Sequence, residues 1–310
     1  MGDSDILYLL VGLVLLFLSG KYLVVGSVQL AKYFGIPTLV IGLTIVALGT
    51  SAPELFVSLK AAITNHPDIS IGNVVGSNIS NIALVLGLTA IIFPIVITRK
   101  LIRVDWLVMM FASVLFYIFS INNILSRWEG AIFIILIISF IIYSIKNGRK
   151  EKSIDNDDVV IRSWYWSLII IVISSLGLVF GAGWLVKGAS GLARDFGVSE
   201  RIISVSIIAF GTSVPELATS IVAAFKKETD ISIGNIIGSN IFNILAILGI
   251  TSFIHPIKVS QSIIEFDMLW MLGISLLLLL TMVGRKKKLT RLNGILLLLS
   301  YGIYIYTLLI

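Results

Sequence analysis

Long apolar runs recur from Ile6 to Ile310 and are separated only by short polar segments. A helix needs roughly 20 apolar residues to cross the hydrocarbon core of a bilayer. Inside lipid, backbone polar groups are satisfied only in helices and closed barrels. Only 13% of the residues are charged and the mean hydropathy is +1.05, far from the composition of a soluble domain. The sequence therefore predicts an all-α integral membrane protein with no room for a soluble catalytic domain.

The apolar runs and the charges between them predict the number of spans and their orientation. Both termini lie on one side of a ten-span protein. Of the 23 Lys and Arg residues, sixteen then fall on the other side, four on the side of the termini and three inside spans. Lys and Arg are enriched in cytoplasmic loops, so we expect a plasma-membrane protein with both termini extracellular. The expected spans are residues 6–30, 37–64, 69–92, 104–121, 129–146, 164–193, 200–225, 231–254, 267–284 and 293–310.

Several residue types limit what the chain can bind. The net charge of +6 comes from cations at span ends, which favours contact with the lipid bilayer and not with nucleic acid. The absence of cysteine excludes disulfides and thiolate metal sites. His66 and His255 lie in short connections between apolar runs, where we expect them to be solvated. No resident cofactor is expected, and a monomer is the expected unit.

The second half of the chain repeats the first. IVALGTSAPELFVSLKAA (45–62) recurs as IIAFGTSVPELATSIVAA (207–224), and DISIGNVVGSNISNI (68–82) recurs as DISIGNIIGSNIFNI (230–244). Both matches hold at an offset of 162 residues without a gap. Because one offset contains five expected spans, an odd number, the second copy must enter the membrane from the opposite face. Such inverted repeats are typical of secondary transporters, which bind their substrate where the two halves meet.

The repeat also predicts the domain organisation. We expect ten transmembrane helices in two inverted five-helix repeats, joined by one mixed-charge segment that the charge count places in the cytoplasm. The first repeat is predicted at 1–146 with its motif at 44–94, the linker at 147–163, and the second repeat at 164–310 with its motif at 206–256.

A glutamate is duplicated with the motif. Glu54 and Glu216 lie near the middle of their expected spans, where an ionised carboxylate is costly and therefore indicates function. Two facing carboxylates repel each other, and a bound cation removes that repulsion. One divalent ion neutralises both charges, as do two monovalent ions or two protons. The pair therefore predicts exchange of cations at a shared site.

The residues around each glutamate add oxygen atoms, which suit hard cations such as sodium and calcium. Pro53 and Pro215 lack an N–H and should leave backbone carbonyls free near the motif threonines. In the next span of each half, a serine and an asparagine four residues apart share one helix face. These pairs are Ser77 with Asn81 and Ser239 with Asn243.

At these motifs the sequence resembles the cation/calcium antiporter superfamily, and specifically the sodium/calcium exchanger branch with its archaeal and bacterial members. GTSAPE with GNVVGSNISN is similar to the first α-repeat of that family, and GTSVPE with GNIIGSNIFN to the second. The resemblance implies a transporter and not an enzyme, with the first and sixth helices sliding across the others. It implies calcium between Glu54 and Glu216, assisted by Thr50 and Thr212. It implies sodium ligands at Ala47, Thr50, Ser51, Glu54, Ser77, Asn81, Ala209, Thr212, Ser213, Glu216, Ser239 and Asn243.

One position departs from the family pattern and leaves the coupling open. Many of these exchangers carry Asp where this chain has Asn243, so only two core carboxylates remain. The resemblance implies electrogenic exchange of three Na⁺ for one Ca²⁺. The alternatives are H⁺/Ca²⁺ antiport on the same scaffold and a passive cation channel. The GNxxEL-type motif of the proton-coupled branch is absent, which favours sodium. An intramembrane hydrolase is disfavoured because the serines have no paired His or Lys base.

The orientation can be tested directly because the chain contains no native cysteine. A cysteine introduced by Asp155→Cys is expected to react with an impermeant maleimide only from the cytoplasmic side, and one introduced by His66→Cys only from outside. The reverse labelling pattern would overturn the orientation while leaving the inverted repeat intact.

Overall fold

The computed structural model describes residues 3–148, 163–197, 211–283 and 288–309, and almost all of them are helical. The first half contains α1 (Asp3–Phe34), α2 (Thr38–Ile41), η1 (Gly42–Val46), α3 (Ala47–Thr50), α4 (Ala52–Ile63), α5 (Pro67–Ser80), η2 (Asn81–Leu86), α6 (Gly87–Ile92), β1 (Ile95–Val96), η3 (Leu101–Asp105), α7 (Trp106–Ser120), β2 (Ile124–Leu125) and α8 (Arg127–Gly148), where η marks a π-helical stretch. The second half contains α9 (Trp164–Asp195), α12 (Val214–Phe225), α13 (Thr229–Phe242), η5 (Asn243–Leu248), α14 (Gly249–Ile254), β3 (Ile257–Lys258), η6 (Ile263–Asp267), α15 (Met268–Met282), β4 (Lys288–Leu289) and α16 (Arg291–Leu309).

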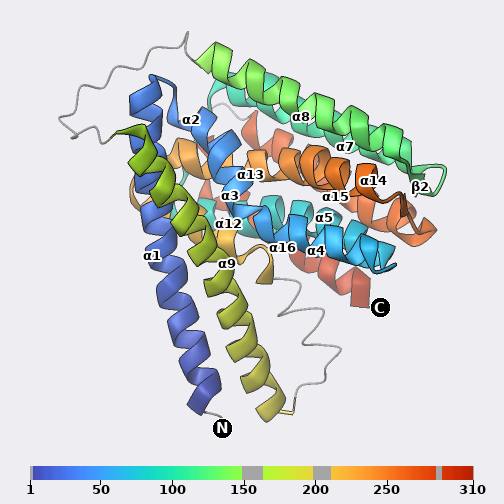
Figure 1. The fold of residues 1–310 in the computed structure, drawn as a ribbon, viewed down its shortest axis with the longest axis horizontal. Coiled ribbons are helices and arrows are strands. Elements are labelled where there is room, and N and C mark those ends of the chain that lie inside the picture. The colour runs from blue at the N-terminus through green and yellow to red at the C-terminus, as the bar shows by residue number, and fades with distance from the viewer. Residues whose placement is uncertain (1–2, 149–162, 198–210, 284–287, 310) are drawn as a thin grey trace.

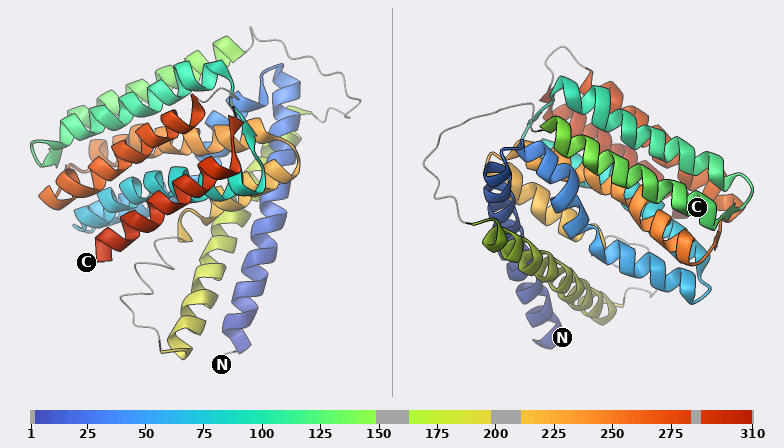
Figure 2. Two further views of the ribbon diagram at one scale, coloured as in Figure 1. Left: turned by 180° about the vertical axis from the view of Figure 1, so that it is seen from behind. Right: turned by 45° about the horizontal axis from the view of Figure 1, so that its top comes forward.

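Two long helices stand apart from the rest. α1 and α9 lie side by side and cross the other helices at a steep angle (Figures 1 and 2). Their contact is close because small residues line it. A Cβ added at Gly12 would lie 2.6 Å from the backbone N of Leu185, and one at Gly188 would lie 2.5 Å from the backbone N of Leu9. Small residues let membrane helices approach to backbone distance, so α1 and α9 form one two-helix unit.

The span that carries Glu54 is broken in the middle. The segments Thr38–Thr50 and Ala52–Ile63 are bent by 47° relative to each other, with Ser51 at the break. Pro53 lies in the first turn of α4 and provides no N–H for the carbonyl of Gly49. Pro215 has the same place in α12. The helix break that the two prolines predict is therefore present in the first half, and α12 starts in the same way in the second.

Two short strand pairs show how the halves are related. β1 pairs with β4 and β2 pairs with β3, both antiparallel. α7 leads from β1 to β2, and α15 leads from β3 to β4, so the two pairs lie at opposite ends of these helices. α7 runs from the β1–β4 pair to the β2–β3 pair, and α15 runs from the β2–β3 pair back to the β1–β4 pair. The two helices contact each other and are therefore antiparallel neighbours. Each half contributes one strand to each pair, which is the arrangement that an inverted repeat requires.

The centre of the bundle is formed by the two spans that follow the glutamate helices. In the most apolar 18-residue stretch of the span Thr229–Ile254, 89% is buried, whereas in that of the peripheral span Arg127–Gly148 28% is buried. The first part of the broken span packs on α13 through glycines. A Cβ at Gly42 would lie 2.9 Å from the carbonyl O of Ile231, and one at Gly234 would lie 2.8 Å from that of Leu39. These contacts hold the beginning of the broken span against the core.

The expected spans agree with the helices in number as far as the chain is described. Eight helices are long and apolar enough to cross a membrane, and the bent pair makes nine. The remaining expected span, 200–225, is the seventh in the chain and is described only from residue 211, where α12 forms its second part. The linker residues 149–162 also lie outside the described residues. The all-helical prediction missed four strands, because two residues are too few to show strand periodicity.

Backbone-distance packing at Gly238 gives a stability prediction. A Cβ there would lie 2.6 Å from the carbonyl O of Leu43 and 2.8 Å from the Cβ of Ala47. Gly238→Ala is expected to cost about 1–3 kcal/mol through overpacking, seen as a lower Tm of the purified protein. The control is Gly273→Ala on the exposed face of α15, where no described atom would lie within 4 Å of the new Cβ. An equal fall in Tm for both variants would contradict the packing.

Candidate functional site

Both duplicated glutamates lie in the first turn of a helix that begins inside the membrane region. Glu54 follows Pro53 in α4, and Glu216 follows Pro215 in α12. The first N–H groups of a helix have no intrahelical acceptor and carry partial positive charge, which stabilises a nearby carboxylate. The breaks therefore place two helix N-termini beside the two acids.

The two carboxylates are completely buried and incompletely satisfied. Glu54 and Glu216 both have 0% exposure, and they are close enough for their charges to repel. Neither oxygen of Glu54 accepts a hydrogen bond from another residue in the described chain, and Oε2 of Glu216 accepts none. Buried carboxylate oxygens without partners are costly, and a cation is the ligand that compensates them.

Hydroxyl groups from both halves surround Glu216. Ser51 Oγ, at the break of the first half, donates to Glu216 Oε1 at 3.1 Å. Ser239 Oγ on α13 donates to the same oxygen at 3.5 Å. The hydroxyl of Thr50 lies 3.4 Å from Ser239 Oγ and 3.3 Å from the carbonyl O of Ala47. A serine of the first half thus forms a hydrogen bond with the glutamate of the second half.

The described residues that the resemblance implies as ligands lie on α3, α4, α5, η2, α12, α13 and η5 and directly before α4 and α12. Eleven of the twelve are described, and Ala209 lies outside the described residues. Thr212 is partly exposed, and the other ten are buried. The structure joins Thr50, Ser51, Glu216 and Ser239 by the contacts above. Ser77, Asn81 and Ser213 are buried, and their polar side-chain atoms have no hydrogen-bond partner in the described chain. Ala47, Glu54 and Asn243 complete the buried set.

Two further asparagines hold the site and were missed from the sequence. Asn73 Nδ2 donates to the carbonyl O of Glu54 at 3.2 Å and to Ser58 Oγ at 2.9 Å. Its repeat mate Asn235 donates to Ser220 Oγ at 3.3 Å and accepts from Thr50 Oγ1 at 3.0 Å. Both are duplicated at the 162-residue offset. A search for every polar residue kept in both copies would have found them.

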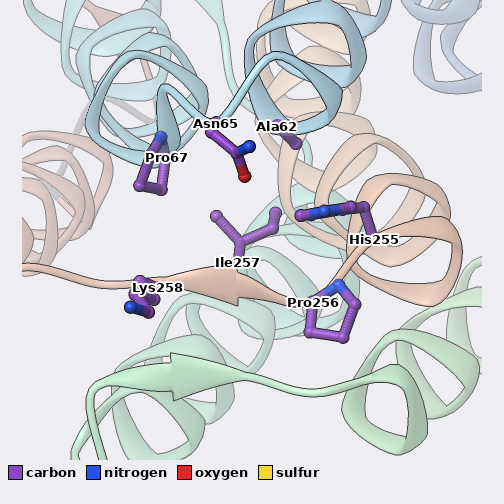
Figure 3. Close-up of a pocket in the computed structure, with 7 residues that line it drawn as sticks. All are labelled: Ala62, Asn65, Pro67, His255, Pro256, Ile257 and Lys258. Atoms are coloured by element: carbon purple, nitrogen blue, oxygen red, sulfur yellow. The ribbon is translucent and has the colours of Figure 1, made fainter.

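The candidate site offers oxygen atoms as ligands, and the two histidines lie outside it. In the described residues no group of three or more His, Cys, Asp or Glu side chains could hold a metal ion. His255 lines a separate pocket of about 360 Å³ between the α4–α5 and α14–β3 connections (Figure 3). Asn65 points into this pocket from the other half (Figure 3). His66 is exposed as expected, whereas His255 is partly buried, and its Nδ1 is buried without a described partner.

Apolar spanning helices, an inverted repeat and a central pair of carboxylates define a multi-pass membrane transporter and not an enzyme. Comparison with known proteins agrees. Residues 4–146 and 166–310 match the sodium/calcium exchanger protein family, and the chain belongs to this family.

Relatives and solved structures support the assignment over nearly the whole chain. The sodium/calcium exchanger MaX1 of Methanosarcina acetivorans is 32% identical over 98% of both chains. The inner membrane protein YrbG of Escherichia coli is 34% identical over 87% of this chain and 86% of its own. A structure of the sodium-calcium exchanger NCX_Mj, soaked with 10 mM Na⁺ and zero Ca²⁺, superposes with a TM-score of 0.86 at 35% identity, covering 99% of this chain and 100% of the other. The chain therefore belongs to the archaeal and bacterial branch of the exchangers.

The uncompensated carboxylates predict how cations affect stability. A ligand that binds only the folded state at about 100 times its Kd adds about 2.7 kcal/mol of stability. Calcium is therefore expected to raise the Tm of the purified protein, whereas Glu54→Gln should raise the Tm in cation-free buffer by removing a buried charge. The same variant should lose the calcium-dependent shift. Magnesium serves as the control ion, and a calcium shift that survives Glu54→Gln would contradict the site.

Proposed function

We propose that this protein is a secondary antiporter that exports calcium in exchange for sodium by alternating access. The observation that carries the proposal is the pair of buried carboxylates, Glu54 and Glu216, with three oxygens that accept no hydrogen bond from another described residue. An empty site with both acids ionised holds two negative charges in a low-dielectric core. Cation loading removes this penalty, so the loaded states are favoured for crossing the membrane.

The proposed ligand roles are those that the family resemblance implies, and the burial of the described ligand residues supports them. Calcium binds between Glu54 and Glu216, assisted by the backbone carbonyls of Thr50 and Thr212 at the helix breaks. Sodium binds around them, at the hydroxyls of Ser51, Ser77, Ser213 and Ser239, the amide oxygens of Asn81 and Asn243, and the carbonyls of Ala47 and Ala209. Because both ions need the same two carboxylates, they exclude each other, and this exclusion is the basis of coupled exchange.

The strand pairs indicate which part moves. β1–β4 and β2–β3 tie the two halves together at both ends of α7 and α15. Rocking one half against the other would have to break these hydrogen bonds. α1 and α9 share no strand pair with the bundle in the described chain, and they contact α12 and the broken span. We therefore assign alternating access to sliding of the α1–α9 unit past the site.

The predictions about membrane location, orientation, repeat boundaries and oligomeric state are part of this proposal. The protein lies in the plasma membrane with both termini outside, and the 147–163 segment separates two five-helix repeats on the cytoplasmic side. One chain contains both glutamates, so a monomer is sufficient for exchange. Coupling to protons in place of sodium is the alternative that the transport experiment must separate.

The deciding experiment is uptake of radiolabelled Ca²⁺ into proteoliposomes loaded with sodium. Uptake is expected with an outward sodium gradient and not with an equal choline gradient, because sodium release must precede calcium binding. Glu54→Gln and Glu216→Gln are each expected to reduce uptake by at least about a hundredfold, since each halves the compensating charge. Uptake driven by a proton gradient alone would identify H⁺/Ca²⁺ antiport. Wild-type rates in either variant would remove the glutamates from the site.

The charge carried per cycle gives a separate prediction. Three Na⁺ against two carboxylates leave the loaded site with one positive charge, whereas calcium leaves it neutral. Moving one charge across 100 mV is worth about 2.3 kcal/mol, so an inside-negative potential should favour calcium export. The measurement is sodium-driven uptake with the potential set by potassium and valinomycin. A measured flux of two Na⁺ per Ca²⁺ would contradict electrogenic exchange.

A further inference from the structure

A second pair of amides lies next to the proposed ion site. Asn243 Nδ2 donates to Asn78 Oδ1 at 3.0 Å, and both side chains are buried. Asn243 begins η5, four residues after Ser239, so the two share one helix face. Ser239 reaches the Glu216 carboxylate. Among the hydrogen bonds of the described residues, the one to Asn243 links Asn78 to the site.

The orientation of Asn78 is set by groups that can only accept hydrogen bonds. Its Nδ2 lies 3.4 Å from the backbone carbonyl O of Asn240 and 3.7 Å from Sδ of Met271. A carbonyl oxygen and a thioether sulfur provide no donor. The amino group of Asn78 must therefore face them, and its Oδ1 must face Asn243.

The same logic passes to Asn243. Because Asn78 Oδ1 only accepts, Asn243 must present its amino group there, and its own Oδ1 lies on the opposite side of the amide. That Oδ1 is buried and has no hydrogen-bond partner in the described chain. A sodium ion needs oxygen ligands, and an amide turned the other way would direct N–H groups at the cation.

We propose that Asn78 is a positioning residue that fixes Asn243 with its amide oxygen toward the sodium-binding part of the site. The proposal rests on the proposed sodium/calcium exchange. Asn78 does not bind sodium itself. It holds the neutral amide of Asn243 in the orientation that a cation ligand needs. A neutral ligand supports sodium without adding a third negative charge to the site.

The repeat mate of this pair lacks the arrangement and provides a matched control. Asn240 and Asn81 correspond to Asn78 and Asn243 at the 162-residue offset. Both side-chain polar atoms of Asn240 and both of Asn81 are buried without a hydrogen-bond partner in the described chain. The amide of Asn81 is therefore free to turn toward a bound ion, whereas that of Asn243 is fixed beforehand.

The test compares Asn78→Leu with Asn240→Leu in the full-length protein. Loss of the orienting bond is expected to raise the half-saturating sodium concentration about tenfold, the effect of one neutral hydrogen bond. The half-saturating calcium concentration should change less than about twofold, because calcium relies on the carboxylates. Asn240→Leu should leave both values within about twofold. Asn78→Ala, which removes the amide without adding bulk, should reproduce the sodium-specific change.

A double-mutant cycle separates positioning from a merely structural role. If Asn78 acts through Asn243, then Asn78→Leu in an Asn243→Leu background should add no further sodium defect. Additive defects, equal losses for sodium and calcium, or unchanged sodium affinity in Asn78→Leu and Asn78→Ala would overturn the proposal.

A binding readout keeps this test independent of transport. The sodium-dependent rise in Tm of the purified protein is measured for the same variants, and the sodium concentration at half-effect should shift about tenfold for Asn78→Leu only. Absence of sodium-driven uptake by the wild type would contradict the proposed function, while the Tm shifts would still decide the role of Asn78. No difference between Asn78→Leu and Asn240→Leu in this assay would overturn that role.

Discussion

Two carboxylates buried in a membrane protein impose the strictest demand on this structure. Glu54 and Glu216 are fully buried and repel each other. Their negative charge must therefore be compensated by groups or ions inside the protein. Part of the compensation is built in. Both acids lie in the first turn of a helix, and hydroxyls of Ser51 and Ser239 reach Glu216. The rest has to come from cations, and that need links the fold to transport.

The helix breaks are a consequence of the same demand. A helix N-terminus can lie beside a buried acid only if a helix starts in the middle of the membrane, and Pro53 and Pro215 make this possible. The unpaired carbonyls that such a break creates would be costly in contact with lipid. The break itself is buried at Thr50 and Ser51, and the bent span packs on α13 at backbone distance through Gly42 and Gly234. Glycine contacts, breaks and acids therefore depend on one another.

The two halves are alike in sequence but differ in their local contacts. Asn73 braces the Glu54 helix within its own half, whereas Asn235 also accepts a hydrogen bond from Thr50 of the other half. Asn78 holds Asn243, while the corresponding Asn240 and Asn81 have no partner in the described chain. Inverted repeats cannot be symmetric in a state that opens to one side only. Differences of this kind are what the proposed alternating access requires from a duplicated sequence.

The sequence by itself determined the helical membrane class, the inverted repeat and the two acids. Lipid admits few backbone structures, an odd number of spans per copy forces inversion, and a carboxylate in an apolar run is conspicuous. It also predicted the break at Pro53, because proline acts locally. Tertiary structure decided what depends on contacts distant in sequence, such as the β1–β4 and β2–β3 pairs and the bracing by Asn73 and Asn235. It also decided the orientation of the Asn243 amide, which rests on the Asn240 backbone and Met271 through Asn78. An amide carries a donor and an acceptor on the same side chain, so only its neighbours in space determine which one faces the ion.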